Sequence, residues 1–219
     1  MREVVVAGVG MCKFGRYPSG YEDLGQEAVM KALKDADLEW RDVNAIFCAN
    51  AYSGMGVGNN IAARIGKTGI PIVNVENACS GGGSSFRLCY QAVAASLYDV
   101  CLAIGVEKIP GGILDDTSWP DYERDMGFNV QPANYALEIQ KHMEEFGSTV
   151  EQFAMVTVKN RKNGVLNPYA GFQKEVTLQE VLNSRMIATP LRLLMCCANG
   201  DGAAAAILCN PKKLKSRNR

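Results

Sequence analysis

The sequence predicts an α/β fold in which parallel strands form a sheet covered by helices on both faces. Two observations carry this prediction: short apolar runs alternate with amphipathic stretches over the first hundred residues, and those runs contain almost no charged residue. Strands that alternate with helices are typical of parallel βαβ units, and uncharged strands are typical of a sheet buried on both faces. A third observation, the loss of this alternation after residue 106, predicts a mainly helical insertion before the chain returns to the sheet.

The composition excludes two large classes of function. The 219 residues carry 23 Lys and Arg against 23 Asp and Glu, whereas a nucleic-acid-binding protein normally shows a basic excess or stripe. The longest apolar runs fall far short of the roughly 20 residues that span a bilayer, and the run after Met1 is too brief for a signal peptide. We therefore expect no nucleic-acid partner, no membrane span and a cytoplasmic location, with a peroxisomal location left open.

Four strands and three helices are expected in the first 106 residues. Residues 21–36 carry apolar side chains at helical spacing, and residues 70–75 form an apolar run in which Pro71 stands near the start, where a strand tolerates it. Gly8 and Gly10, at the end of the first apolar run, are interpreted as turn residues. The strands are expected at residues 3–8, 45–49, 70–75 and 100–106, and the helices at residues 21–36, 59–65 and 82–97.

The composition of the chain changes after residue 106. Proline and charged residues become more frequent, and amphipathic helices are expected at residues 134–146 and 150–161. Residues 203–208 (AAAAIL) predict a strand that returns to the sheet, although their alanines would also suit a helix. The expected division is a core at residues 1–106, a mainly helical insertion at 107–199, a returning strand at 200–210 and a basic, solvated tail at 211–219.

The glycine-rich segments do not match the phosphate-binding motifs. The GKT at residues 66–68 imitates the end of a Walker A loop, but Ile61 stands where the first glycine of that loop belongs. The GVG at residues 8–10 follows a strand, but Lys13 occupies the third glycine position of the dinucleotide fingerprint. These glycines therefore predict turns rather than a nucleotide site.

Eight cysteines and a single histidine limit the chemistry. Half of the cysteines lie in or beside apolar runs, where Cys behaves as a small buried hydrophobe. These are Cys48, Cys89, Cys101 and Cys209. No CxxC pair is present, and the adjacent Cys196 and Cys197 with one His do not form a zinc set, so no metal is expected. His142 lies in the charged stretch KHMEE, which favours a solvated surface histidine over a catalytic base.

The strongest chemical signal is the segment VENACSGGGSS at residues 75–85. It predicts a buried strand that turns sharply through small residues into a helix, with Cys79 on the turn. A thiol there meets the positive end of the helix dipole, which favours the thiolate, while backbone N–H groups stabilise an oxyanion and the glycines admit a substrate. These properties describe an acyl-accepting nucleophile, although a buried structural cysteine in a glycine-rich loop fits the spacing equally well.

The helix after Cys79 favours the catalytic interpretation. Its sequence, GGSSFRLCYQAVAASL at residues 82–97, has small or apolar residues on nearly every face, and Arg87 is its one charged residue. Such a helix is expected to be surrounded by protein. A buried helix directly behind a thiol suits a catalytic core better than a surface layer. Cys79 is then the nucleophile, and the other seven cysteines are packing residues.

At this point several stretches of the chain resemble the thiolase family, and more specifically its sterol-carrier-protein-type (lipid-transfer) branch. The NACSG at residues 77–81 resembles the nucleophile loop of these enzymes. Further similar stretches run from the first strand to the last: VAGVGMCKFG, TGIPIVNVENACSGG, AIGVEKIPGG, KHMEEFGSTVEQFA, VKNRKNGVLNPYAGFQKE and MCCANGDGAAAAIL. The set is much more specific than the cysteine turn alone.

The resemblance implies the N-terminal half of a thiolase: a mixed five-stranded sheet covered by helices, with residues 107–199 as a mainly helical loop domain over the acyl and coenzyme A site. Cys79 matches the family nucleophile, which takes the acyl group of a 3-ketoacyl-CoA as a thioester. Met126 and Gly127 resemble a loop-domain pair that lines the acyl pocket, although a methionine there also suits plain packing. Coenzyme A is implied as a co-substrate, with no bound cofactor and no metal.

The resemblance stops at the end of the first half of the family. Thiolases contain a second half of similar fold, which supplies catalytic histidine motifs and a second cysteine as acid and base, and those motifs do not follow here. Cys196 and Cys197 match a structural stretch before the returning strand. The chain is therefore expected to be a fragment, one subunit of a split enzyme, or a half-domain with a non-catalytic role.

The leading hypothesis is thiolase-type acyl transfer, the cleavage or formation of a 3-ketoacyl-CoA through an acyl-Cys79 intermediate. The implied partners are acyl-CoA, a second copy of the chain, a thiolase C-terminal half and a zinc-ribbon/OB-fold acyl-CoA-binding protein. One alternative is a non-catalytic acyl-CoA-binding or assembly subunit of a hetero-complex. Another is a retro-aldol lyase, which the intact Cys79 disfavours because related lyases rely on other residues.

Overall fold

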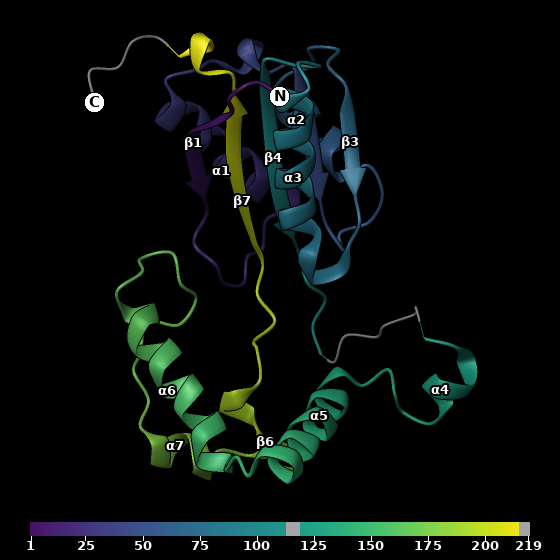
Figure 1. Ribbon diagram of the computed structural model, residues 1–219, viewed down its shortest axis with the longest axis vertical. Coiled ribbons are helices and arrows are strands. Elements are labelled where there is room, and N and C mark those ends of the chain that lie inside the picture. Colours follow the sequence, from purple (N-terminus) through teal and green to yellow (C-terminus); the bar gives the residue numbers. More distant parts are fainter. Residues whose placement is uncertain (113–118, 215–219) are drawn as a thin grey trace. The chain divides into compact units, whose positions relative to one another are not determined.

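The computed structural model describes residues 1–112 and 119–214, which divide into two compact units (Figure 1). The core unit comprises Met1–Ile109 with Gly200–Arg219, and the inserted unit comprises Pro110–Asn199. Residues 113–118 of the insertion and residues 215–219 of the expected basic tail lie outside the described residues. The chain leaves the core unit once and returns to it once.

The core unit alternates strands with helices until the insertion begins. Its strands are β1 (Val5–Met11), β2 (Ala45–Ala49), β3 (Ile72–Val75), β4 (Val100–Glu107) and β7 (Gly202–Cys209), and its helices are α1 (Tyr21–Ala36), α2 (Val57–Ile65) and α3 (Gly81–Ala94). The predicted order of elements is confirmed, and α1 and β2 have the predicted bounds. The alanine-rich segment after the insertion is the strand β7 rather than a helix.

The five strands form one mixed sheet in the order β1-β7-β4-β2-β3. β2 pairs in parallel with both β3 and β4, whereas β7 pairs antiparallel with both β4 and β1. The parallel pairing that the strand–helix alternation predicts is found among β2, β3 and β4, whereas β7, which follows the insertion, runs against its neighbours. The mixed five-stranded sheet implied by the family resemblance is confirmed.

Helices cover both faces of the sheet, and in Figure 1 α3 lies in front of the strands and α1 behind them. Successive side chains of β2 take part in different cores because a strand alternates its side chains between faces. Ile46 and Cys48 belong to the cluster that includes α1 and α2, whereas Ala45 and Phe47 belong to the cluster that includes α3. Burial on both faces explains why the strands carry almost no charge.

Gly8 and Gly10 lie inside β1 rather than in a turn, which corrects both the expected strand at residues 3–8 and the expected turn. A Cβ atom at Gly8 would lie 2.4 Å from the Ala36 backbone nitrogen, and one at Gly10 would lie 2.3 Å from the Ala28 carbonyl oxygen. These glycines let α1 pack directly on the strand, because any side chain would overlap the helix backbone.

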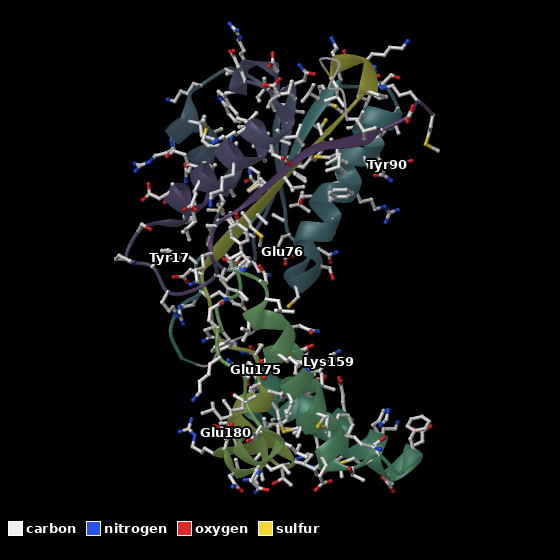
Figure 2. All side chains as sticks on the ribbon, turned by 90° about the vertical axis from the view of Figure 1, so that its left-hand side faces the viewer. Tyr17, Glu76, Tyr90, Lys159, Glu175 and Glu180 are labelled. Carbon is white, nitrogen blue, oxygen red and sulfur yellow. The ribbon has the colours of Figure 1, made fainter. Side chains whose placement is uncertain are left out.

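Helix α3 is buried along one side only. Ser85, Cys89 and Val93 are buried against the sheet, whereas Phe86 is 39% exposed and Tyr90 is 46% exposed. The described residues of this chain do not surround the helix on every side, so its burial by a partner stays a prediction. The helix instead presents a partly apolar outer face, from which Tyr90 projects in Figure 2.

The inserted unit is mainly helical. Its elements are α4 (Asp121–Asp125), α5 (Gln131–Phe146), α6 (Val150–Val165), α7 (Leu178–Asn183), β5 (Met186–Ala188) and β6 (Leu191–Arg192). Thr149 caps α6 by accepting the Gln152 N–H at 3.4 Å, and Thr177 caps α7 by accepting the Glu180 N–H at 3.1 Å. The hairpin of β5 and β6 was not predicted, because strands this short leave no periodicity to detect. In the part of the chain that the structure describes, no helix has the length and apolarity to cross a membrane.

Candidate active site

The carboxyl ends of β2, β3 and β4 meet at one edge of the sheet, because these three strands run in parallel. Asn50, Glu76 and Lys108 are the residues that directly follow them. The Asn50 N–H donates to the Val75 carbonyl oxygen at 3.4 Å, which joins the first two strand ends. Open α/β sheets place their ligand sites outside the carboxyl ends of the strands, so this edge is where chemistry is expected.

Cys79 lies on the turn between β3 and α3, within a short 3-10 helix at Ala78–Ser80. Its side chain is exposed. The Ala78 N–H donates to Glu76 Oε1 at 2.6 Å, so a carboxylate directly after the strand holds the residue before the cysteine. The structure thus places Cys79 on a strand-to-helix turn at the carboxyl edge of the sheet.

The start of α3 provides polar backbone groups beside this turn. Ser80, the N-cap residue, has φ −91° and ψ 0°, in the sparsely populated region where active-site residues often lie. Asn77 Nδ2 donates to Ser84 Oγ at 2.9 Å, which ties the turn to the first turn of the helix. The Gly81 N–H donates to the Ala78 carbonyl oxygen of the preceding turn, and the Ser80 side chain makes no capping hydrogen bond. The N–H groups that follow in the first turn of a helix have no partner within that helix. Such groups attract a thiolate or an oxyanion.

Small residues bring the start of α3 close to the strands behind it. A Cβ atom at Gly81 would lie 3.1 Å from the Ala49 Cβ atom at the end of β2. The buried Ser85 hydroxyl donates to the Gly82 carbonyl oxygen at 2.9 Å and lies 3.4 Å from the Ile104 carbonyl oxygen, which links α3 to β4. The position of the cysteine turn is therefore fixed by its strand on one side and by helix packing on the other.

Glu107, the last residue of β4, fixes the neighbouring loop. Its carboxylate accepts hydrogen bonds from the Ala51 N–H at 2.6 Å, the Tyr52 N–H at 3.1 Å and the Ser53 hydroxyl at 2.5 Å. The Ser53 hydroxyl oxygen in turn accepts the Lys108 N–H at 3.0 Å. Charge-assisted hydrogen bonds thus tie the loop after β2 to the end of β4.

Asp201, which directly precedes β7, holds a second set of loops at this edge, and we call its hydrogen bonds the Asp201 anchor. Its buried carboxylate accepts the Tyr17 N–H at 3.0 Å, the Ile109 N–H at 3.1 Å and Lys108 Nζ at 3.2 Å. Burial alone would raise the pKa of Asp201, but these hydrogen bonds hold that pKa below its usual value. Figure 2 labels Tyr17 and Glu76 at this end of the core unit. The anchor joins the two points at which the chain leaves and re-enters the core unit.

The other cysteines mostly differ from Cys79 in exposure. Cys12, Cys48, Cys89, Cys101 and Cys209 are buried, and Cys196 is partly buried. The pKa of Cys48 is raised to about 12, mainly because the thiol is buried. This thiol therefore stays protonated at neutral pH. Cys197 is exposed, so its expected packing role is wrong.

Met126, Gly127 and His142 all lie in the inserted unit. Met126 directly follows α4 and is 66% exposed, and Gly127 has φ +84°, a left-handed conformation that favours glycine after a helix. His142 is exposed on α5, with its ring centroid 4.7 Å from that of Phe146 and 5.6 Å from that of Phe153. His142 is therefore a surface histidine packed on aromatic rings.

Sequence reasoning missed three carboxylates of the strand edge, Glu76, Glu107 and Asp201. Their signal is a charged residue at the end of an otherwise uncharged strand: Glu76 follows β3, Glu107 ends β4 and Asp201 precedes β7. A carboxylate in such a position accepts backbone N–H groups of the loops that leave the sheet.

The mixed sheet, the helical unit inserted between β4 and β7 and the exposed cysteine at the start of α3 together define a thiolase-like chain. The family model of the thiolase N-terminal domain matches residues 4–117. The chain belongs to the thiolase family, and it corresponds to the N-terminal half of those proteins.

Curated relatives align with nearly the whole chain. The chain is 39% identical over 220 residues to the benzoylsuccinyl-CoA thiolase subunit BbsB of Thauera aromatica, with 98% of this chain and 57% of the relative covered. It is 38% identical over 232 residues to sterol carrier protein 2 of Bos taurus, with 98% of this chain and 43% of the relative covered. The predicted family and branch are confirmed. The chain spans about half the length of these relatives.

A solved structure supports the same fold. The Ltp2-ChsH2(DUF35) aldolase resembles the chain with a TM-score of 0.81 and 26% sequence identity, and the match covers 95% of this chain and 56% of that chain. Other curated relatives carry the name acetyl-CoA acetyltransferase, so the family is one of acyl-CoA acyltransferases.

Proposed function

We propose that this chain contributes the nucleophile half of a thiolase-type acyltransferase, in which Cys79 carries the acyl group. The observation that supports this most is the exposed Cys79 thiol on the turn into α3. Cys79 lies on the turn that leads into α3 at the carboxyl edge of the sheet, and the N–H groups at a helix start attract negative charge. A nucleophile and the groups that stabilise its charge therefore come from one segment of the chain.

The proposed reaction proceeds in two steps. The Cys79 thiolate attacks the 3-keto carbon of a 3-ketoacyl-CoA, and the adjacent carbon–carbon bond breaks. Its electron pair leaves with acetyl-CoA or a homologue, which takes up a proton, and the acyl group stays on Cys79 as a thioester. The thiolate of coenzyme A then attacks this thioester, releases the shortened acyl-CoA and restores the Cys79 thiolate. N–H groups at the start of α3 stabilise the negative oxygen formed in each attack.

The proton transfers require an acid and a base, which we assign to a thiolase C-terminal half or to a partner chain. Two observations support a partner. BbsB is named as a subunit, and the name of the similar aldolase joins two components, Ltp2 and ChsH2. A zinc-ribbon/OB-fold acyl-CoA-binding protein and a second copy of this chain are the other proposed partners.

The inserted unit is the proposed acyl and coenzyme A side of the enzyme. Met126 and Gly127 are proposed to line the acyl pocket, and the high exposure of the Met126 side chain leaves it accessible to an acyl chain. A methionine suits a pocket that must accept varied apolar groups, because its side chain is unbranched and polarizable. Coenzyme A is the proposed co-substrate.

The proposal is tested by mixing the full 219-residue chain with acetoacetyl-CoA and weighing the intact protein. We expect a mass adduct that hydroxylamine removes, as it does for a thioester. Cys79→Ser is expected to lose the adduct, whereas Cys197→Ser, which removes another exposed thiol, is expected to retain it. If the wild-type chain forms no adduct even with a thiolase C-terminal half added, acyl transfer at Cys79 is contradicted.

A second candidate function is a non-catalytic subunit that binds acyl-CoA or organises a hetero-complex. The name of BbsB, a thiolase subunit, favours it. Calorimetry separates the two functions, because a non-catalytic subunit would bind acyl-CoA or its partner with equal affinity in the wild-type chain and in Cys79→Ser, and would form no adduct.

A further inference from the structure

Ala78, the residue before the cysteine, has a backbone conformation that its side chain disfavours. Its φ is +43°, in the left-handed region, where a Cβ atom crowds the backbone. The described residues contain two other non-glycine residues of positive φ, Asp37 and Ser96. Asp37 ends α1 and Ser96 follows α3, positions where a left-handed residue is a common way to end a helix. Ala78 instead begins the short 3-10 helix that leads into α3, so helix termination does not explain its conformation.

The hydrogen bonds around Ala78 show what holds it there. Its N–H donates to Glu76 Oε1 at 2.6 Å, a bond that closes a tight loop of three residues. One residue further on, the chain is fixed by the Ser80 N–H, which donates to the Asn77 carbonyl oxygen at 2.9 Å. The Glu76 carboxylate is therefore the side chain that binds the backbone of Ala78, the residue with the disfavoured conformation.

Among the described residues, the hydrogen bond that the Glu76 side chain accepts comes from the Ala78 backbone N–H. This hydrogen bond fixes the backbone of Ala78. Conformations of this kind persist only where the surrounding structure over-determines them, and they gather at active sites.

We propose that Glu76 is a positioning residue for Cys79. Its carboxylate holds the Ala78 N–H and keeps Ala78 left-handed, which directs the chain so that the Cys79 sulfur stands beside the first N–H groups of α3. This role deepens the proposed acyl transfer and rests on it. Without the hydrogen bond, Ala78 relaxes toward the conformations that alanine prefers, and the thiol loses its place at the helix start.

The test compares the rates at which iodoacetamide alkylates Cys79 in the full chain, measured by mass spectrometry of the peptide that carries it. Glu76→Gln removes the charge but keeps an oxygen that accepts the Ala78 N–H, whereas Glu76→Ala removes both. We expect Glu76→Ala to react about fivefold more slowly than Glu76→Gln, the effect of losing one hydrogen bond. The comparison between these two variants isolates the hydrogen bond from the charge.

A second substitution tests whether the bond acts through Ala78. Glycine adopts a positive φ without a Cβ penalty, so Glu76→Ala combined with Ala78→Gly is expected to recover the Glu76→Gln rate within about twofold. A merely structural weakening of the loop would not be rescued in this way. The matched control is Glu180→Ala, which also removes a carboxylate that accepts a backbone N–H, that of Thr177 at 2.7 Å, but at the start of α7. It is expected to leave the Cys79 rate unchanged.

Two outcomes overturn the proposal: equal rates for Glu76→Ala and Glu76→Gln, or a slow rate that Ala78→Gly does not restore. The buried thiols of Cys48 and Cys89 report unfolding in the same digest, because they react only when the core opens. Iodoacetamide needs no acyl-CoA, so the result is independent of the adduct experiment. If the chain shows the predicted alkylation rates but forms no thioester, acyl transfer is contradicted and the positioning role of Glu76 is kept. If it forms the thioester but does not show the predicted rates, the positioning role is contradicted and acyl transfer is kept.

Discussion

The core unit and the inserted unit are built by different means. The core unit buries a five-stranded sheet between helices, with large side chains such as Leu24, Ile46 and Leu102 fully buried. Among the described residues of the inserted unit, the buried hydrophobic side chains are Ala136, Ala154, Val181 and Leu191. Several of its longer apolar residues are exposed, such as Met155 at 48% and Leu166 at 81%. The core unit is therefore stabilised by its interior, whereas the inserted unit relies more on local contacts such as helix caps.

The two units also offer two kinds of exposed thiol. Cys79 stands on a strained turn that leads into a helix of the core unit, and strand-end carboxylates brace the loops around that edge. Cys197 lies in an irregular segment of the inserted unit, after a short 3-10 helix at Leu193–Met195. Exposure is common to both, so the surrounding backbone must account for any difference in their chemistry.

The largest expected effect is in the tight packing of the core unit. Gly10→Ala places a Cβ atom 2.3 Å from the Ala28 carbonyl oxygen and 2.4 Å from the Ala32 nitrogen, so α1 must move off β1. We expect the free energy of unfolding to fall by about 3 kcal/mol or more, measured by urea denaturation. Gly83→Ala is the control, since its added Cβ meets no atom within 4 Å and alanine favours a helix. A loss for Gly10→Ala no greater than that for Gly83→Ala would contradict close packing of α1 on β1.

The next effect tests the anchor at the point where the insertion begins and ends. Asp201→Asn removes the charge that faces Lys108 Nζ at 3.2 Å, and at pH 7 we expect the free energy of unfolding to fall by about 2 kcal/mol. Because the folded pKa of Asp201 is lowered, its contribution is complete above the unfolded pKa of about 3.9 and is lost as pH falls through the folded pKa. The wild-type and variant stabilities are therefore expected to converge in acid.

Urea denaturation at several pH values measures this convergence. Asp99→Asn is the matched control, because Asp99 pairs with Arg2 and Lys213 at the surface of the core unit. Its loss at pH 7 is expected to be smaller, since solvent screens exposed ion pairs. A stability gap for Asp201→Asn that stays constant down to acid pH would show that the charge does not stabilise the anchor.

The smallest effect is expected at the N-terminal cap of α6 in the inserted unit. Thr149→Ala removes the hydroxyl that caps α6 and should destabilise that helix by about 1 kcal/mol, whereas Thr149→Ser keeps the hydroxyl and most of the stability. Amide hydrogen exchange is the measurement, because it reports local opening. We expect α6 to exchange faster than β4 in the wild-type chain, and faster still in Thr149→Ala. Protection of α6 equal to that of β4 would break the contrast between the units.

The regular part of the core unit was predictable because its patterns are strong. Apolar spacing gave the bounds of α1, and the apolar run AIFCA gave those of β2. The glycines of β1 misled the prediction, because Gly8 serves a close helix contact that only the folded structure reveals. The residues of β7 also do not indicate its antiparallel direction, because an alanine-rich segment has the same pattern in a parallel and in an antiparallel strand.

The candidate site was predictable at Cys79 and not around it. Small residues between a strand and a helix indicate the turn, but no residue type announces that Ala78 will be left-handed. The bond from Ala78 to Glu76 depends on that backbone conformation, so sequence reasoning had no means of finding it. The sequence also does not tell which chain covers α3, because an apolar helix looks the same whether this chain or another covers it.

The central claim is that the acyl group resides on Cys79, and its most direct test is to locate the thioester. The full chain is incubated with acetoacetyl-CoA, digested under mildly acidic conditions, and the acylated fractions of the Cys79 and Cys197 peptides are compared. We predict that acylation concentrates on the Cys79 peptide and vanishes in Cys79→Ser without moving to Cys197. Equal acylation of both peptides, or acylation of Cys197 alone, would contradict the account, because exposure rather than the strand-to-helix turn would then decide which thiol reacts.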